Sequence, residues 1–378
     1  MGQNGAKAAG KKGTTRLFRT ASVPRPPDTR TTRCPTRAIL NPTVTEPRSA
    51  TVKLFVTGGA GFIGSNFVRM ALDGRLPGLE QAEITVFDAL TYSGTLTNLE
   101  SVADHPRFRF IRGDIRDMPA LLEHVPQHDA IVHFAAESHV DRSVSDAGIF
   151  VDTNVSGTQK LLEAARQLGT DRFLHVSTDE VYGSIDEGEW DEEEPLLPNS
   201  PYAASKAASD LMVRAYHRTH GLNTVMTRCS NNYGPHHFPE KVIPLFVTNL
   251  LDGHPVPLYG DGGNQRDWLH VDDHCRGIAL VLQKGTSGEV YNIGGGTELT
   301  NTELTQMLLE LTGRDESFVR HVEDRLGHDR RYCVSIDKIS RELGYRPEVE
   351  FRQGLADVVQ WYRDNRGWWE PLKARAGL

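Results

Sequence analysis

A glycine-rich stretch, Thr57-Gly58-Gly59-Ala60-Gly61-Phe62-Ile63-Gly64, lies between a short apolar run at Lys53–Thr57 and a helical pattern at Ile63–Leu72. Glycines permit a tight turn and a close approach of the backbone to a pyrophosphate, and the N-terminus of a helix supplies free N–H groups. A GxGxxG pattern alone is weak evidence, but this one stands between a strand and a helix, as dinucleotide binding requires. We therefore predict a phosphate-binding turn here.

The glycine turn opens a longer alternation of β-branched strands and helical patterns. Strands are predicted at Lys53–Thr57, Glu83–Asp88, Arg107–Arg112, Ala130–Phe134, Arg172–Ser177 and Thr224–Cys229. Helices are predicted between them near Ile63–Leu72, Met118–Val125, Ile149–Leu168 and Pro201–His220. This alternation is typical of an α/β fold with a doubly wound parallel sheet of the Rossmann type, which we expect over residues 52–230 as the NAD-binding domain.

Beyond residue 230 the alternation fades, and Pro and Gly become frequent. We predict a smaller, irregular domain at residues 231–378 that binds the substrate, with some chain returning to the Rossmann sheet. Its expected elements are a strand at Glu289–Ile293 and helices near Leu304–Leu311 and Gln353–Asn365. The acidic run Asp186–Glu194 is expected to form a solvated loop and not a metal site.

The composition excludes several classes of protein. The chain has 378 residues, with 42 Lys and Arg against 50 Asp and Glu. Residues 1–50 hold ten of the basic and two of the acidic side chains, so the remainder carries a formal charge of −16. A body so acidic is a poor nucleic-acid binder, and no apolar run approaches the roughly 18 residues of a transmembrane helix. The cysteines form no CxxC pattern, which favours a reduced, cytoplasmic protein; they are Cys34, Cys229, Cys275 and Cys333.

Residues 1–51 differ in character from the rest. They are rich in Thr, Arg, Pro and Gly and show neither helical nor strand periodicity, so we predict a disordered basic extension. A secretory signal would need an apolar core that is missing here. An organelle transit peptide, a basic tail that contacts anionic partners, and a dispensable extension remain open.

Asp88 ends the second predicted strand, 24 positions after Gly64. An acidic side chain there can accept hydrogen bonds from the hydroxyls of the adenosine ribose. Because a carboxylate would repel a 2′-phosphate, this position favours NAD over NADP. The alternatives are a plain aspartate at a strand end and a glycine turn that holds no ligand.

Tyr202 and Lys206 stand four residues apart at the start of a predicted helix, so their side chains share one face. A tyrosine with an ordinary pKa of about 10 is a poor base at neutral pH. A nearby ammonium, together with the positive ring of an oxidised nicotinamide, favours the phenolate and makes Tyr202 usable as a base. The YxxxK pattern is common by chance, but here it follows the glycine turn at a spacing that suits a Rossmann fold.

The fifth predicted strand runs into Thr178-Asp179-Glu180. Ligands of open α/β sheets bind beyond the carboxyl ends of the strands, where this tripeptide lies. A straight strand would direct Asp179 and Glu180 to opposite faces, so the backbone must turn there if both serve one substrate. Two adjacent carboxyl groups in different environments can act as an acid and a base. An acidic loop with no catalytic role is the alternative.

Motifs along the chain resemble those of the dTDP-glucose 4,6-dehydratases, which are extended short-chain dehydrogenases/reductases. The resemblance runs from about Val52 to the C-terminus, essentially the whole predicted folded part. The Thr-Asp-Glu tripeptide looks like the signature of this family, because related 4-epimerases share the glycine turn and YxxxK but lack the acid pair. The motifs are TGGAGFIG, FDALTYSG, GDI, HFAAESHVDRS, TNVSGT, VSTDEVYG, YAASK, RCSNNYGP, YGDGGNQRDWLHVDDH, YNIGGG and DRLGHDRRY.

The resemblance implies a lyase that oxidises and then reduces one sugar. Tyr202 would take the proton of the glucosyl 4-hydroxyl while hydride passes from carbon 4 to NAD. Lys206 would hold the ribose hydroxyls and lower the pKa of Tyr202, and Thr178 would hydrogen-bond the 4-oxygen. Glu180 would then remove the proton of carbon 5 as Asp179 protonates the departing 6-hydroxyl. Return of hydride to carbon 6 would give dTDP-4-keto-6-deoxyglucose.

The resemblance also implies binding residues, position by position. Cofactor contacts are expected at Gly58, Gly61, Phe62, Ile63, Gly64, Asp88, Leu90, Thr91, Asp114, Ile115, Ala135, Ala136, Thr153, Tyr202, Lys206 and Asn232. Nucleotide-sugar contacts are expected at Ser138, Thr178, Asn231, Lys241, Val242, Pro257, Tyr259, Arg266, Asn301, Asp324, Arg325 and His328. Asp114 would face the adenine and Asn232 the nicotinamide. Leu326 replaces the proline usual in this family, which costs loop stiffness but removes no chemical group.

The resemblance further implies a cytoplasmic homodimer, built from the helices near Ile149–Leu168 and Pro201–His220, that acts on dTDP-glucose. One alternative is a UDP-glucose 4,6-dehydratase, or a UDP-sugar epimerase or decarboxylase, because the nearest motifs do not separate thymine from uracil. Epimerisation or decarboxylation would leave Asp179 and Glu180 without a shared task. A second alternative is a catalytically silent NAD sensor, which would be expected to lose Tyr202, Lys206 or the acid pair.

Overall fold

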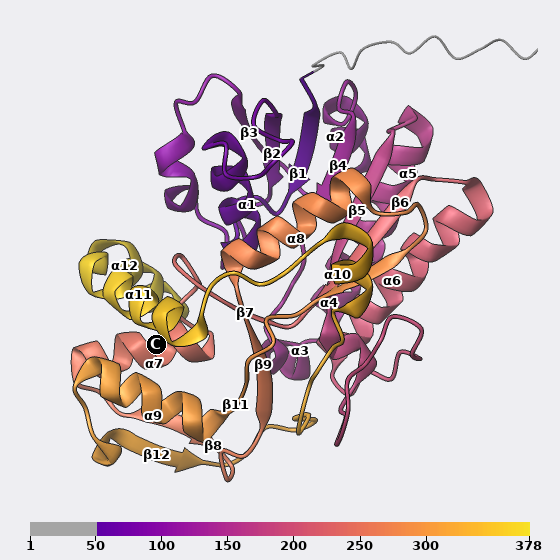
Figure 1. Ribbon diagram of the computed structural model, residues 1–378. Coiled ribbons are helices and arrows are strands. Elements are labelled where there is room, and N and C mark those ends of the chain that lie inside the picture. The colour runs from indigo at the N-terminus through magenta and orange to yellow at the C-terminus, as the bar shows by residue number, and fades with distance from the viewer. Residues whose placement is uncertain (1–50) are drawn as a thin grey trace, which may run out of the picture. The chain divides into compact units, whose positions relative to one another are not determined.

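The computed structural model describes residues 51–378, and Figure 1 shows how their helices and strands are arranged. The predicted basic extension lies, except for Thr51, outside the described residues. Seven parallel strands form the main sheet in the order β10-β6-β5-β4-β1-β2-β3, which is the doubly wound arrangement predicted. The strands are β1 (Lys53–Thr57), β2 (Glu83–Asp88), β3 (Phe108–Arg112), β4 (Ala130–His133), β5 (Arg172–Thr178), β6 (Thr224–Cys229) and β10 (Val290–Ile293).

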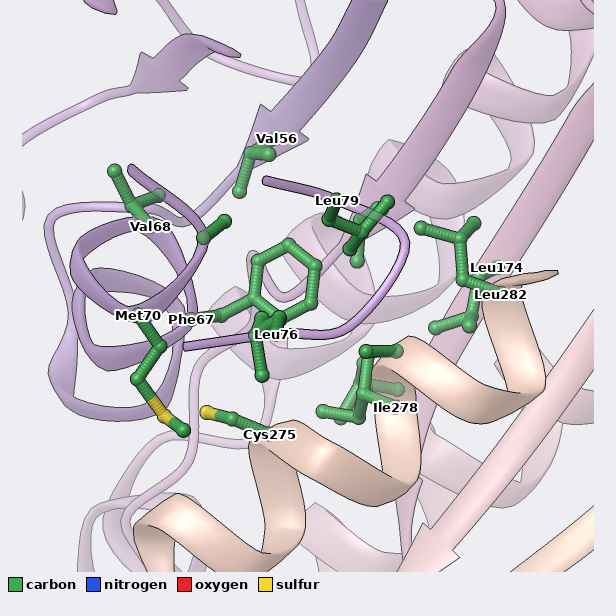
Figure 2. Close-up of a cluster of buried hydrophobic side chains, with 14 of the residues drawn as sticks. Val56, Phe67, Val68, Met70, Leu76, Leu79, Leu174, Cys275, Ile278 and Leu282 are labelled. Carbon is green, nitrogen blue, oxygen red and sulfur yellow. The ribbon is translucent and has the colours of Figure 1, made fainter. Parts of the chain in front are cut away.

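Helices cover both faces of this sheet because its strands are apolar on both sides. Leu54 and Val56 of β1 belong to one core with helices α1 (Phe62–Leu72) and α8 (Val271–Lys284). Figure 2 shows this core, with Phe67 of α1 among side chains of the sheet and of α8. Phe55 points the other way, into a second core with α2 (Met118–His124), α5 (Thr158–Leu168) and α6 (Pro201–His220).

Two predicted elements differ in the structure. The strand expected at Glu289–Ile293 is β10, which pairs with β6 in the main sheet and not with strands of the smaller domain. The helix expected near Ile149–Leu168 is interrupted, because a wider π-helical segment (η2, Val151–Gly157) separates α4 (Gly148–Phe150) from α5. This segment carries Asn154, whose amide bonds the backbone of Glu137 and the hydroxyl of Ser205.

The acidic run at Asp186–Glu194 lies between η3 (Asp179–Tyr182) and α6 and is largely exposed, as predicted. Only Trp190 and Glu192 are partly covered. The backbone of Trp190 bridges to Val334, and Glu192 accepts a hydrogen bond from the backbone of Asn292. None of the helices within residues 51–378 is long and apolar enough to cross a membrane.

The smaller part of the fold surrounds a third core, in which Trp369 is fully buried. Its helices are α7 (Val242–Asp252), α9 (Asn301–Thr312), α11 (Phe351–Asp364) and α12 (Arg366–Ala376). Its strands are β7 (Asn231–Tyr233), β9 (Gln265–His270) and β11 (Glu298–Thr300) in one small sheet, and β8 (Val256–Tyr259) and β12 (Val319–Val322) in another. The remaining short helices are η1 (Leu96–Val102), α3 (Val140–Ser145), η4 (Glu316–Phe318) and α10 (Asp337–Leu343).

Candidate active site

A cavity of about 430 Å³ opens at the carboxyl ends of the main parallel strands. Its lining includes Gly61 and Asp88 from the strand–helix turns, and Lys241 and Arg266 from the smaller domain. In open α/β sheets this edge is where ligands bind. The cavity therefore joins the predicted cofactor side to the predicted substrate side.

The glycine turn has the geometry that a dinucleotide needs. Gly58 has a positive φ of +71°, and a Cβ there would lie 2.5 Å from the backbone nitrogen of Ala135. A Cβ on Gly64 would lie 2.4 Å from the carbonyl oxygen of Gly58. Helix α1 begins after Gly61 with no side-chain cap, so its first N–H groups are free for an anion. The turn thus fits the pyrophosphate of NAD.

Asp88 anchors the same turn and faces the cavity. Its carboxylate accepts hydrogen bonds from the backbone N–H of Ala60 at 2.9 Å and of Leu90 at 2.8 Å. Burial raises the pKa of Asp88, and these two hydrogen bonds act in the opposite direction. Leu90, expected as a cofactor contact, does not line the cavity: it has a φ of +53° and its side chain packs against the core beside α1 and α8.

Asp114 lines the cavity as expected, but it does not stand alone. Arg116 Nη2 donates to Asp114 Oδ2 at 2.7 Å, and Arg116 Nε lies 3.0 Å from Asp114 Oδ1. These hydrogen bonds lower the pKa of Asp114. Arg116 also lines the cavity and was not predicted from the sequence.

Tyr202 and Lys206 lie on the cavity face of α6, one turn apart. Lys206 Nζ donates to the carbonyl oxygen of Val176 at 2.8 Å, which holds the ammonium against the end of β5. Burial lowers the pKa of Lys206 to about 8, and the charge of Asp210 acts against this. Burial raises the pKa of Tyr202 well above its ordinary value, and the charge of Glu180 adds to the rise. The protein's own charges therefore do not by themselves favour the phenolate that the sequence analysis expected.

The backbone turns directly after β5, as we predicted for the case that Asp179 and Glu180 serve one substrate. Thr178 caps a short 3-10 helix, η3 (Asp179–Tyr182), by accepting a hydrogen bond from the N–H of Glu180. Asp179 and Glu180 consequently both line the cavity instead of pointing to opposite faces of the sheet. Gly183 ends the turn with a φ of +84°, and a Cβ there would lie 2.3 Å from the carbonyl oxygen of Leu197.

The two carboxyl groups of this turn lie in different electrostatic surroundings. Burial raises the pKa of Asp179 well above its ordinary value, and the charges of Glu180 and Asp267 raise it further. Burial also raises the pKa of Glu180, but three cations oppose this effect; they are Arg266, Arg325 and Lys241. The arrangement favours a protonated Asp179 beside an ionised Glu180, as a paired acid and base require.

The same three cations form the far wall of the cavity. Arg266 is buried, stacks over the ring of Tyr332 and donates to the carbonyl oxygen of Asp329 at 2.9 Å. Lys241 Nζ donates to the carbonyl oxygen of Ser138 at 2.7 Å. Arginine forks and an ammonium suit the oxygens of a diphosphate.

The structure brings most of the predicted residues to one cavity. The predicted residues that line it, besides those described above, are Phe62, Ile63, Thr91, Ile115, Ala135, Ala136, Thr153, Asn232, Ser138, Asn231, Val242, Pro257, Tyr259, Asn301 and His328. Asp324 does not line it; its carboxylate instead accepts a hydrogen bond from His328 Nδ1 at 2.6 Å. Leu326, which stands where the family usually has a proline, is 78% exposed and does not line the cavity.

His237 and Glu240 are among the lining residues that the sequence analysis missed, because no motif marks their chemistry. His237 stacks on the ring of Phe62 with 4.1 Å between ring centroids. Glu240 binds Arg142 through Oε2, while its Oε1 is buried without a hydrogen-bond partner among the described residues. Both follow the predicted RCSNNYGP motif closely, which is the signal that could have drawn attention to them.

The fold and the site together define a class of protein, the extended short-chain dehydrogenases/reductases. The defining features are the parallel sheet, the glycine turn before the uncapped helix α1, and the Tyr202–Lys206 pair.

Comparison with known proteins narrows this class. The model of the GDP-mannose 4,6 dehydratase family matches residues 55–358. A dTDP-glucose 4,6-dehydratase of Streptomyces niveus is 60% identical over 323 residues, which are 85% of this chain and 96% of the relative. DesIV, a dTDP-glucose 4,6-dehydratase from Streptomyces venezuelae solved with NAD bound, is 63% identical with a TM-score of 0.84, covering 85% of this chain and 100% of that one. The UDP-glucose 4-epimerase of Thermotoga maritima, solved with UDP-glucose, is 30% identical with a TM-score of 0.76, covering 83% of this chain and 100% of that one.

The chain belongs to the GDP-mannose 4,6 dehydratase family, and the relatives that it resembles at about 60% identity are dTDP-glucose 4,6-dehydratases.

Proposed function

We propose that this protein catalyses the NAD-dependent dehydration of dTDP-glucose to dTDP-4-keto-6-deoxyglucose. The observation that carries the proposal is that Asp179 and Glu180, in different electrostatic surroundings, line one cavity that also holds Tyr202. One base beside a nicotinamide suffices for oxidation at carbon 4. An additional acid and base are needed only when water is eliminated across carbons 5 and 6.

NAD fits the cofactor side of the cavity. Gly58, Gly61 and Gly64 leave room for the pyrophosphate, and Asp88 faces the position where an adenosine ribose would lie. Bound NAD supplies an acceptor for the hydride of carbon 4 and, once reduced, the donor of that hydride to carbon 6. A positive nicotinamide ring beside Tyr202 would oppose the effects that burial and Glu180 have on the pKa of this tyrosine.

The residues of the chain then divide the proton transfers. Tyr202 accepts the proton of the 4-hydroxyl, Thr178 hydrogen-bonds the 4-oxygen, and Lys206 orients the ribose. The resulting ketone acidifies carbon 5, whose proton passes to Glu180. Asp179 gives its proton to the 6-hydroxyl, which leaves as water, and the proton held by Glu180 returns to carbon 5 when carbon 6 is reduced. Tyr202 ends with one extra proton and Asp179 with one fewer, and exchange with solvent restores both. The net change is the loss of one water.

The substrate side of the cavity suits a nucleotide sugar. Arg266, Arg325 and Lys241 supply positive charge for the diphosphate. Within the described residues, buried oxygens of Asp179, Asn231 and Glu240 have no hydrogen-bond partner. A buried acceptor without a donor raises the free energy of the folded protein. The hydroxyl groups of a bound sugar can donate hydrogen bonds to these three oxygens.

The alternative functions considered from the sequence use fewer of the residues that line the cavity. An epimerase or a decarboxylase would not need the acid and base of η3. A silent NAD sensor would not need Tyr202 and Lys206 on the cavity face of α6. Uracil in place of thymine would leave all of these groups in use, so the substrate test must include UDP-glucose.

We also infer a cytoplasmic homodimer in which residues 52–230 bind NAD and residues 231–378 mainly bind the nucleotide sugar. Leu211 on α6 is 56% exposed and Val151 on η2 is 51% exposed, and such apolar side chains suit a helical interface. Cys229, Cys275 and Cys333 are free thiols, as expected in a reducing compartment.

A substrate labelled with deuterium at carbon 4 tests the proposed reaction. The purified protein with NAD and dTDP-[4-²H]glucose should yield a product that has lost one water and carries deuterium at carbon 6, seen by mass spectrometry and NMR. Product that keeps deuterium at carbon 4, or that retains the water, would contradict the proposal.

A further inference from the structure

Arg228 on β6 is 5% exposed and does not line the cavity. The proposed chemistry does not use this buried guanidinium. Its Nε donates to Asp210 Oδ2 at 2.9 Å, and its Nη1 donates to the hydroxyl of Tyr182 at 2.7 Å. The guanidinium also stacks over the ring of Tyr182, 4.7 Å from the centroid. One side chain thus bonds two elements that are distant in sequence.

The two elements carry the two halves of the proposed reaction. Asp210 lies on α6 two turns after Tyr202 and one turn after Lys206, which are the residues of the oxidation at carbon 4. Tyr182 is the last residue of η3, the turn that begins with Asp179 and Glu180. Arg228 therefore connects helix α6, which carries the base proposed for oxidation, to the turn η3, which carries the acid and base proposed for elimination.

The connection that Arg228 makes between α6 and η3 has neighbours on both strands that flank β6. Arg228 lies opposite Ser177 of β5 and opposite Asn292 of β10 in the parallel register. The hydroxyl of Tyr182 donates onward to Asn292 Oδ1 at 2.9 Å. Asp210 approaches His175 at 3.4 Å, and burial lowers the pKa of that histidine to about 4, so His175 is neutral and Arg228 is the charged partner of Asp210.

We propose that Arg228 is a positioning residue that fixes the turn Asp179–Tyr182 relative to helix α6, through Asp210 and Tyr182. This inference rests on the proposed function, because it assigns Arg228 to the alignment of two steps of that reaction. A guanidinium suits the task, since its planar fork bonds two partners in fixed directions, whereas an ammonium would hold them loosely.

The inference predicts an effect on one step rather than on both. Loosening η3 displaces Asp179 and Glu180, while Tyr202 and Lys206 stay on α6. Oxidation at carbon 4 should then proceed and elimination should slow. Small displacements of catalytic groups by distant mutations cost up to about 100-fold in rate.

The sharpest variant is Tyr182→Phe, which keeps the buried Asp210–Arg228 ion pair and removes only the hydroxyl that joins it to η3. Its matched control is Tyr291→Phe, because Tyr291 is also fully buried and its hydroxyl bonds Thr286 and Glu342 instead of Arg228. Arg228→Lys keeps the positive charge without the fork. Thermal unfolding with and without NAD checks that each variant folds and binds.

Single-turnover absorbance at 340 nm then separates the steps, and mass spectrometry follows the loss of water. In Tyr182→Phe and Arg228→Lys we expect reduced nicotinamide to form within about twofold of the wild-type rate and to decay about tenfold more slowly, with dehydrated product delayed equally. Tyr291→Phe should match the wild type in both phases.

Wild-type decay in Tyr182→Phe, or equal slowing of formation and decay, would overturn the positioning role. Failure of the proposed function has a different result: the wild-type protein itself would release no dehydrated product from dTDP-glucose.

Discussion

Asp179 and Glu180 are neighbours in sequence, yet the charges that act most on their pKa values differ in sign. Arg266, Arg325 and Lys241 act on Glu180, whereas the largest charges near Asp179 are those of Glu180 and Asp267. Within one short turn, these surroundings favour the proton on Asp179 over Glu180. The predictions below follow from this division and from the site around it.

Glu180→Gln should leave NAD binding and oxidation at carbon 4 intact but release almost no dehydrated product. The substitution removes the base for carbon 5, a loss that typically costs about 10²–10⁴-fold. Absorbance at 340 nm with dTDP-glucose would show reduced nicotinamide that persists. Glu193→Gln, in the exposed acidic loop, is the control, and wild-type turnover by Glu180→Gln would remove the role assigned to that residue.

Tyr202→Phe should stop the reaction one step earlier. Without the phenol no group takes the proton of the 4-hydroxyl, so reduced nicotinamide should form about 10²–10⁴-fold more slowly while NAD still binds. Tyr216→Phe is a matched control on the same helix, because its hydroxyl bonds Gln159 and Glu163. Rapid nicotinamide reduction in Tyr202→Phe would show that another group is the base.

Asp88→Asn should reduce the preference for NAD over NADP. The variant removes the charge that would repel a 2′-phosphate. Its single amide oxygen can replace only one of the two carboxylate oxygens that accept from the N–H groups of Ala60 and Leu90. A lost charge-assisted hydrogen bond weakens NAD binding by roughly tenfold. Calorimetric titration with both dinucleotides measures the ratio, and an unchanged ratio would mean that Asp88 does not select the cofactor.

Lys206→Met should change how stability depends on pH. Burial lowers the pKa of Lys206 to about 8 in the folded protein, against about 10.4 for an unperturbed lysine. Between these values the unfolded chain binds the proton that the folded protein has lost. The wild type should therefore gain roughly 1.4 kcal/mol of stability per pH unit in this window, relative to the variant.

Urea unfolding without added NAD, at several pH values from about 8 to 10, measures this difference. Lys284→Met, at the exposed end of α8, is the control. Parallel stability curves for the wild type and Lys206→Met would show that the folded protein binds that proton as tightly as the unfolded chain.

Leu211→Glu should weaken the proposed homodimer, because it places a charge on the exposed apolar face of α6. Leu197→Glu changes an equally exposed leucine in the loop before α6 and serves as the control. Sedimentation of both variants at several protein concentrations is the measurement. A monomeric wild type, or a Leu211→Glu variant that stays dimeric, would place the interface elsewhere or remove it.

Local signals explain why much of the fold was predictable. The helix Pro201–His220 was predicted with its observed bounds: Ser200 accepts a hydrogen bond from the N–H of Ala203, Pro201 fills the first turn, and Gly221 ends the helix with a φ of +68°. Short β-branched and apolar runs that alternate with helical patterns made β1 to β6 visible. These features depend on neighbours in sequence alone.

The parts that were missed depend on distant partners. The pairing of β10 with β6 joins residues about sixty positions apart, and no short pattern encodes it. The side chain of Leu90 does not line the cavity, and the positive φ of this residue is a feature that a motif does not reveal. Arg228 contacts Tyr182 and not the cavity, so its proposed part in the site became visible only with the contacts.

The central claim is tested most directly by incubating the purified protein and NAD, with no added reductant, with dTDP-glucose, UDP-glucose and GDP-mannose in one vessel, followed by mass spectrometry. The account predicts that dTDP-glucose alone loses one water. Loss of water from UDP-glucose or GDP-mannose instead would overturn the assigned substrate, and no loss from any of the three would contradict the dehydratase function.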